Sequence, residues 1–262
     1  MPFIHPSIEQ QFPHINADQR KAISQADRPL LIIAGPGPGI TFVLVLRALN
    51  VLLAEKCQPK EMVLCTFTEK AAFELRDRIQ QAARAIGYTG DLSQLQVGTI
   101  HGLSNTHISR YRLHTGWGSG AEVLDELTQS LFLFENFDEI VGPVDQTEKI
   151  LGHWSTRWTA IQGLAEFFNK ITEELVSPQA LIDGDDRFLS LVGGAYLRYE
   201  QKLHDLNRLD FAHQQKIFLD LLNNPEIGPK IQAEARYVMV DEYQDTNYIQ
   251  EQLLIRLSAP QN

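Results

Sequence analysis

The sequence has few cysteines, no long apolar run and no excess of positive charge. Cys57 and Cys65 are its only cysteines, which excludes a disulfide framework and leaves no cysteine spacing for a metal site. No uninterrupted apolar run reaches the roughly 18 residues that a membrane-spanning helix needs. The opening residues MPFIH lack the basic start and apolar core of a signal peptide. Together these absences predict a cytoplasmic protein that makes no contact with a membrane.

The charge is negative overall and unevenly divided. The 262 residues carry a formal net charge of −10. Residues 1–110 contain 11 Lys and Arg against 9 Asp and Glu, whereas residues 111–262 contain 12 against 24. Because neutralisation of phosphate charge supplies most non-specific DNA binding, this balance argues against a protein that coats DNA. A local nucleic-acid contact in the first half remains compatible with it.

Four short, continuously apolar runs predict buried parallel strands, since a sheet covered on both faces needs no polar alternation. These runs are residues 29–34, 62–67, 95–100 and 237–242. Helical patterns at 41–56 and 70–86 follow the first two runs. The opening hundred residues therefore predict the β-α-β-α-β order of a doubly wound α/β sheet.

The pattern changes between about residues 103 and 208, where helices are expected with few strand signals. The expected helices are 121–139, 159–175 and 188–206, and the region holds Trp117, Trp154 and Trp158, which we assign to packing. The α/β pattern then resumes, with one more helix at about 248–257. We predict an α/β domain formed by residues 1–102 and 209–262, with an all-helical domain inserted at 103–208.

Residues 34–41, AGPGPGIT, have the outline of a nucleotide-binding loop. Against the template G-x-x-x-x-G-K-[ST], Gly39 and Thr41 match, while Ala34 replaces the first glycine and Ile40 replaces the lysine. In an intact loop, backbone N–H groups surround the phosphates, the lysine neutralises their charge and the hydroxyl holds Mg²⁺. The stretch thus keeps a glycine and the hydroxyl residue of the template but lacks its positive charge.

The chemistry of this loop is expected to be weak. Pro36 and Pro38 have no N–H to donate, and Ile40 supplies no positive charge. A charge-assisted hydrogen bond contributes roughly 1.5–3 kcal/mol to binding, so we expect reduced ATP affinity and very poor hydrolysis. From this stretch alone, a plain Gly/Pro connection between strand and helix is an equal alternative.

A dinucleotide-binding fingerprint is a further alternative for the same glycines. Gly35, Gly37 and Gly39 alternate, and Glu55 follows twenty residues after the first of them. The acid of that fingerprint must end the second strand to reach a ribose. Glu55 precedes the second expected strand, so this interpretation fails.

Residues 237–247, YVMVDEYQDTN, favour the nucleotide site over the plain turn. Here an apolar strand delivers Asp241 and Glu242 at its C-terminal end. In Mg²⁺-nucleotide chemistry one carboxylate positions the metal and the other orients the attacking water. Asp-Glu alone would be better explained as a solvated turn, but the full segment DEYQDTN is not.

This segment resembles the DEFQDTN box of the UvrD/Rep-like superfamily 1 DNA helicases. Four further blocks, which all precede it in the sequence, occur in the same order as in that family. The blocks NADQ (16–19), TFTEKAA (66–72), GTIHG (98–102) and LDF (209–211) resemble the family's NxxQ, TFTNKAA, GTFHS and LDFDDL segments. In the last block Ala212 and His213 replace the acids. The resemblance covers essentially the whole chain. It implies a P-loop NTPase (RecA-like) fold in which ATP binds between two motor domains.

The resemblance also assigns roles to individual residues. The implied cofactor-binding residues are Gln19, for adenine, and Ala34, Gly35, Pro36, Gly37, Pro38, Gly39, Ile40 and Thr41. The implied Mg²⁺ ligands are Thr41 and Asp241. The implied catalytic residues are Asp241, Glu242 as general base and Gln244 for coupling to DNA. The implied residues for single-stranded DNA are Thr66, Phe67, Thr68 and His101, with Phe67 stacking on a base.

Two departures from the family lead us to expect that the chain is inactive alone. Ile40 takes the lysine position, and the sequence ends one helix after the Asp-Glu box, before the later motifs and the second motor domain. The predicted function is a truncated, N-terminal piece of an ATP-dependent DNA helicase that binds ATP, Mg²⁺ and single-stranded DNA and needs a second helicase polypeptide for turnover. The alternatives are a non-catalytic module that binds DNA or a partner, and a decayed helicase remnant.

Overall fold

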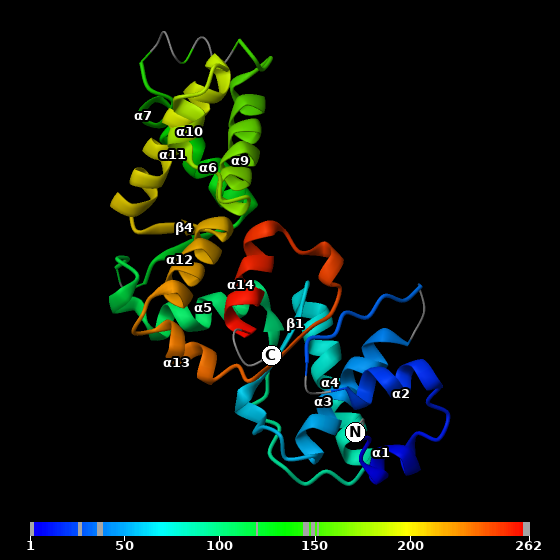
Figure 1. The fold of residues 1–262 in the computed structure, drawn as a ribbon. Helices are drawn as coiled ribbons and strands as arrows, with labels where there is room; N and C mark the ends of the chain where they lie inside the picture. Colours follow the sequence, from blue (N-terminus) through cyan, green and yellow to red (C-terminus); the bar gives the residue numbers. More distant parts are fainter. Residues whose placement is uncertain are drawn as a thin grey trace. The chain divides into compact units, whose positions relative to one another are not determined.

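The structure is a computed structural model that describes residues 3–25, 28–35, 39–118, 120–143, 147, 150 and 152–258. The chain divides into two compact units, whose elements are drawn in Figure 1. Unit 1 comprises Met1–Leu103, Leu222–Thr246 and Leu254–Asn262, and unit 2 comprises Ser104–Leu221 and Asn247–Leu253. The domain boundaries expected after residues 102 and 208 remain a prediction.

Unit 1 contains three parallel strands in the order β2-β1-β5. The strands are β1 (Met62–Thr66), β2 (Gln96–Thr99) and β5 (Tyr237–Val240). Cys65 of β1 lies opposite Gly98 on one side and Val240 on the other. Because the strands are parallel, their C-terminal ends meet at one edge of the sheet. The predicted α/β class with a parallel sheet is confirmed.

The helices predicted at 41–56 and 70–86 form within a few residues of those bounds, as α3 and α4, whereas α1, α2 and α13 were not predicted. Helix α3 (Ile40–Leu53) packs against α2 and α4, and α4 (Glu69–Ala85) also packs against β1 and β2. The remaining elements of this unit are α1 (Pro6–Gln11), α2 (Ala17–Ser24), α13 (Gly228–Ala233) and the short turns η1 (Pro59–Glu61) and η3 (Tyr243–Asp245). Three helices contribute residues to both units: α5 (Ile100–Arg110), α12 (Phe211–Asn223) and α14 (Tyr248–Ser258).

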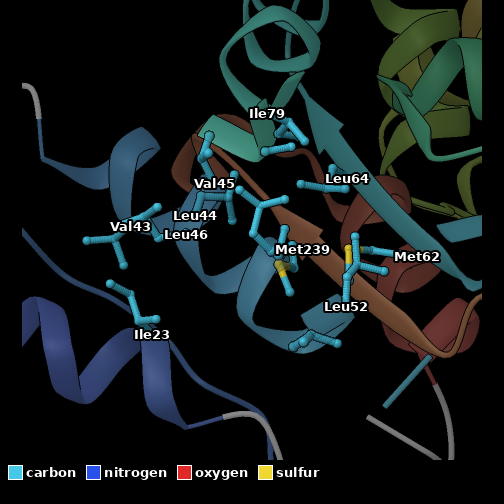
Figure 2. Close-up of a cluster of buried hydrophobic side chains, with 14 of the residues drawn as sticks. Ile23, Val43, Leu44, Val45, Leu46, Leu52, Met62, Leu64, Ile79 and Met239 are labelled. Carbon is cyan, nitrogen blue, oxygen red and sulfur yellow. The ribbon is translucent and has the colours of Figure 1, made fainter. Parts of the chain in front are cut away.

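Helix α3 forms the centre of the hydrophobic core of unit 1. Its sequence ITFVLVLRALNVLL is apolar around most of its circumference, which is the pattern of a buried helix. Figure 2 shows its side chains gathered with Leu64 of β1, Ile79 of α4 and Met239 of β5. Burial of one Leu or Ile side chain stabilises a fold by roughly 1.5–3 kcal/mol. This cluster therefore fixes the start of α3 relative to the sheet.

Asn50 is a polar residue inside this core, and it is only 2% exposed. Its Nδ2 donates to the carbonyl oxygens of Phe3 and Ile23 at 2.8 and 3.3 Å, and its Oδ1 accepts the His5 N–H at 2.8 Å. Burial of an amide is tolerated when its hydrogen bonds are made. These bonds hold the N-terminal segment and the end of α2 against α3.

The strand predicted at residues 29–34 is wrong, because the structure forms no strand there. Leu31 and Ile33 are 70% and 87% exposed, and within the described residues β5 pairs with β1 alone. An apolar run indicates that its side chains can be buried, whereas a strand also needs a neighbouring strand to pair with its backbone N–H and C=O groups. Pro29 has no N–H for such pairing.

Unit 2 is mainly helical but contains a two-stranded parallel sheet of β3 (Glu122–Leu124) and β4 (Arg208–Asp210). The helix predicted at 121–139 is therefore wrong at its start, where three residues pair with β4 instead. The remaining elements are η2 (Arg112–His114), α6 (Glu126–Glu135), α7 (Phe137–Val141), α9 (Arg157–Glu173), α10 (Pro178–Ile182) and α11 (Arg187–Asp205). Helices α9 and α11 agree with the predicted spans.

Aromatic side chains dominate the core of unit 2. Phe137, Phe168, Tyr196 and Tyr199 are among the largest fully buried side chains of the chain. Trp117 and Trp154 pack against this core, as predicted for structural aromatics. Trp158 differs, because it is 42% exposed, with its ring centroid 6.5 Å from that of Phe134.

Candidate functional site

The C-terminal ends of β1 and β5 position the acidic pair. Asp241 follows β5 directly, and its N–H donates to the carbonyl oxygen of Cys65 in β1 at 2.9 Å. Glu242 has a left-handed backbone, with φ 56° and ψ 41°, and turns the chain into η3. Non-glycine residues in this conformation are uncommon and are held by their surroundings, often at ligand sites.

Thr41, in the first turn of α3, reaches the same edge of the sheet. Its Oγ1 donates to Asp241 Oδ2 at 3.2 Å, and the Glu242 N–H donates to Asp241 Oδ1 at 3.2 Å. Burial raises the pKa of Asp241, the Thr41 hydrogen bond lowers it, and the negative charge of Glu242 raises it, with a net rise. A hydroxyl and a carboxylate are oxygen ligands of the kind that Mg²⁺ takes. The structure thus brings the two predicted metal ligands into contact.

The start of α3 fits Mg²⁺ better than it fits the phosphates of a nucleotide. Ile40 is the first residue of the helix, and Gly39 precedes it without a side-chain cap. The first turn contains no charged residue to compensate. The charge of Arg78 on α4 lowers the pKa of Asp241, but it is the smallest of the influences on that group. The lysine position therefore contributes an apolar side chain beside the metal ligands.

The rest of the expected loop is only partly described. Ala34 and Gly35 are exposed, and nothing lies within 4 Å of the place that a Gly35 Cβ would take. Pro36, Gly37 and Pro38 lie outside the described residues. Their expected contacts with phosphate remain predictions.

Gln19 lies beside this loop because α2 packs against α3. It forms a capping box with Asn16: the Gln19 N–H donates to Asn16 Oδ1 at 2.9 Å, and Gln19 Oε1 accepts the Asn16 N–H at 3.1 Å. The other end of its amide faces the loop, since a Cβ at Gly39 would lie 3.4 Å from Gln19 Nε2. One amide oxygen thus fixes the side chain and leaves its NH₂ group near the expected nucleotide.

Glu242 and Gln244 form a separate exposed pair at the same edge. Gln244 Nε2 donates to Glu242 Oε2 at 2.5 Å, within the turn η3 that ends at Asp245. A base that orients water must be accessible and held in place. Glu242 meets both conditions in this structure.

The expected DNA-binding residues gather at the ends of β1 and β2. Phe67 is 53% exposed immediately after β1. Thr68 caps α4 by accepting the Ala71 N–H at 3.1 Å. Thr66 is only 4% exposed, and its hydroxyl donates to the Thr68 carbonyl oxygen at 3.0 Å, so it shapes the turn from inside. Phe67 is the exposed aromatic side chain of this block.

His101 lies in the first turn of α5, directly after β2. Burial lowers the pKa of its imidazole, and the negative charge of Glu69 on α4 raises it in part. Thr99 Oγ1 donates to Glu69 Oε1 at 2.8 Å. The two expected DNA blocks are therefore joined by a hydrogen bond that the sequence did not reveal.

A buried charged network lies at the LDF block (209–211), in unit 2. His213 Nδ1 lies 2.9 Å from both carboxylate oxygens of Asp210, and its Nε2 lies 3.6 Å from Glu200 Oε1. Tyr199 OH donates to Asp210 Oδ2 at 2.7 Å. Burial alone would lower the pKa of His213, but the two carboxylates outweigh it and raise that pKa to about 9.

The pKa values of the two carboxylates in this network are lowered, whereas that of His213 is raised. Burial would raise the pKa of Asp210, yet the charge and hydrogen bonds of His213 hold it below its ordinary value. His213 lowers the pKa of Glu200 to about 2, against burial, together with Lys216, whose Nζ donates to Glu200 Oε1 at 2.5 Å. Sequence reasoning noted only that Ala212 and His213 replace family acids. The spacing of three residues between Asp210 and His213 was the available signal for their contact.

Comparison with known proteins identifies the family. The profile described as "UvrD/REP helicase N-terminal domain" matches residues 15–262. The chain therefore belongs to the UvrD/REP helicase N-terminal domain family, and the predicted resemblance is confirmed.

Three relatives illustrate the match. DNA helicase II of Rickettsia typhi is 29% identical over 92% of this chain and 35% of its own length. ATP-dependent DNA helicase UvrD1 of Mycobacterium tuberculosis is 28% identical over 95% of this chain and 31% of its own length. ATP-dependent DNA helicase SRS2 of Saccharomyces cerevisiae is 27% identical over 92% of this chain and 21% of its own length. The chain spans between a fifth and about a third of the length of these relatives.

No helix within the described ranges is both long enough and apolar enough to cross a membrane.

Proposed function

We propose that this chain binds Mg²⁺-ATP weakly at the end of β5, binds single-stranded DNA at the ends of β1 and β2, and hydrolyses ATP very poorly by itself. The contact between Thr41 and Asp241 carries the proposal, because it places two oxygen ligands for Mg²⁺ at the start of α3. The names of the relatives, which are DNA helicases, support the choice of ATP and DNA as ligands.

Each group has a role in the proposed site. Thr41 and Asp241 hold the metal, and Glu242 takes the proton of the attacking water. Gln244, hydrogen-bonded to Glu242, is placed to report the state of the nucleotide. Gln19 reads the adenine through its NH₂ group, while its oxygen stays in the capping box.

The weakness of the site follows from Ile40. In the family motif a lysine neutralises the phosphates, and loss of one preorganised charged donor costs on the order of 10²–10³ in rate. Helix α3 still directs its backbone N–H groups toward the phosphates, which favours an anion. Some binding is therefore retained while the chemical step is lost.

We further propose that turnover requires a second helicase polypeptide. The groups named here all come from unit 1, and the family resemblance implies a nucleotide held between two motor domains. The alternative is a module that grips DNA or a partner without using ATP. Ile40 is the observation that favours this alternative.

Steady-state ATP hydrolysis with and without a dT oligonucleotide tests the proposal. We expect DNA binding by fluorescence anisotropy together with turnover near the background of an Asp241→Asn variant. Turnover well above that background would contradict the proposed weakness of the site. DNA binding that is unaffected by Mg²⁺-ATP, with no detectable binding of nucleotide, would favour the non-catalytic module.

A further inference from the structure

Glu69 joins the two expected DNA blocks through one hydrogen-bonded chain. It is the first residue of α4, directly after the cap residue Thr68. Its Oε1 accepts the Thr99 hydroxyl at 2.8 Å, and Thr99 Oγ1 accepts the Gly102 N–H at 3.0 Å. The first turn of α4 and the first turn of α5 are therefore tied together by a carboxylate.

This tie is made by a side chain that is itself exposed. Thr99 is only 5% exposed, so its hydroxyl is largely removed from water and the bond to Glu69 satisfies it. Glu69, in contrast, belongs to the exposed surface together with Phe67 and Lys70. Its negative charge is thus held at the surface where single-stranded DNA is expected to pass.

The negative charge of Glu69 acts on His101 in the GTIHG block. Its charge raises the pKa of His101 against the lowering that burial causes. A DNA phosphate near His101 would meet the same negative charge. Like charges a few ångströms apart repel each other measurably even in water, and phosphate contacts dominate the affinity for DNA.

The corresponding block of the resembled family reads TFTNKAA, with a neutral amide where this chain has Glu69. An amide oxygen can accept the Thr99 hydroxyl as a carboxylate does, but it brings no charge. The two functions of Glu69, the tie and the charge, can therefore be separated by one conservative substitution.

We propose that Glu69 sets the DNA affinity of this chain: it positions the GTIHG block through Thr99, and its carboxylate repels the DNA backbone. The inference rests on the proposed binding of single-stranded DNA at the ends of β1 and β2. Affinity at neutral pH is consequently lower than the same surface would have with an amide at position 69.

Binding of a fluorescent dT oligonucleotide to Glu69→Gln, followed by anisotropy at low salt, tests this inference. We expect roughly three- to tenfold tighter binding than wild type, because the repulsion is removed and the tie to Thr99 is kept. The gain should shrink as salt is raised, since ions screen exposed charges. A purely structural role of Glu69 would not produce this salt dependence.

Two further variants control the measurement. Glu74→Gln changes the net charge equally at an exposed position of α4, and we expect its affinity to stay within about twofold of wild type. Glu69→Ala removes both the charge and the tie, and it should bind less tightly than Glu69→Gln. Circular dichroism melting checks that each variant is folded.

The outcomes separate this inference from the function on which it rests. If wild type binds DNA and Glu69→Gln binds equally or more weakly, the repulsive role of Glu69 is wrong. If Glu74→Gln tightens binding as much as Glu69→Gln does, the effect is one of net charge and the inference is again wrong. If neither wild type nor any variant binds DNA, the proposed DNA-binding function fails first, and the inference fails with it.

Discussion

Thr41 and Asp241 lie 200 residues apart in the sequence, and the hydroxyl of the first donates to the carboxylate of the second at 3.2 Å. The contact forms because α3 is buried against the sheet and β5 ends beside its first turn. It brings two expected Mg²⁺ ligands together. This pair is the geometric basis of the proposed nucleotide site.

Loss of either partner should abolish the part of nucleotide binding that depends on Mg²⁺. For Thr41→Val and for Asp241→Asn we expect nucleotide affinity to become the same with Mg²⁺ and with EDTA, as followed by fluorescence of a labelled ATP analogue. Thr246→Val is the control, since it removes a hydroxyl that donates to the Tyr243 carbonyl oxygen in the same segment. A full Mg²⁺ effect in both site variants would contradict the assignment.

Gln19→Glu should separate adenine recognition from helix capping. A glutamate at this position can still accept the Asn16 N–H, so α2 should remain capped. It cannot donate an NH₂ hydrogen bond to adenine near Gly39. We expect about tenfold weaker ATP binding, little change with GTP, and an unchanged melting temperature. An equal loss for both nucleotides would show that Gln19 does not read the base.

Phe67→Ala should weaken binding of single-stranded DNA. Stacking of a base on an aromatic ring contributes about 1–3 kcal/mol, so we expect at least fivefold lower affinity in an anisotropy titration. Phe3→Ala is a matched control, since Phe3 is 50% exposed and Phe67 is 53% exposed. The stacking role is wrong if the two variants bind DNA alike.

The buried network around His213 should make stability depend on pH. Its folded pKa of about 9 lies above the ordinary value of 6.5, so protonated His213 stabilises the fold. This contribution is fully present below about pH 6.5 and is lost as the pH rises through about 9, for a total on the order of 3 kcal/mol. Burial raises the pKa of Cys57 to about 11 and that of Cys65 to about 12, so both thiols stay protonated in the folded chain, and they lower its stability only as the pH approaches 9.0, where the unfolded thiols ionise.

Urea unfolding between pH 6 and pH 9.5 measures this dependence. The free energy of unfolding of wild type should fall across the range, whereas His213→Gln should be less stable at pH 6 and should lack most of the fall below about pH 8.5, where the cysteines do not yet contribute. His114→Gln, at an exposed histidine of η2, should keep the wild-type slope. A wild-type slope that survives in His213→Gln would show that other groups cause it.

The sequence predicted the parts of the fold that depend on local apolar pattern. Continuous apolar runs located β1 and β5, and the periodicity of residues 41–56 located α3. The run at 29–34 is as apolar as β1 but forms no strand, because strand formation needs a pairing partner and an apolar run does not reveal one. The short strands β3 and β4 were not predicted, because three residues are too few to show a strand pattern.

The candidate site was predictable where a motif carried it. The loop and the Asp-Glu strand predict that Thr41 and Asp241 share one site, and the two are in contact. The bond between Glu69 and Thr99 could not be read from sequence, because it depends on how α4 and α5 meet at the sheet edge. The protonation of His213 also depends on burial between two carboxylates, and Glu200 reaches it from another helix.

The most direct test of the central claim is a titration of Ile40→Lys with Mg²⁺-ATP by isothermal calorimetry, beside wild type and an Ile40→Met control. This position is proposed to face the nucleotide phosphates, where Ile40 supplies no positive charge. A charge-assisted hydrogen bond contributes roughly 1.5–3 kcal/mol, so Ile40→Lys should bind ATP at least tenfold more tightly, and Ile40→Met should resemble wild type. Equal affinity of Ile40→Lys and Ile40→Met, with both variants folded, would contradict the assignment of this loop as a weakened ATP site.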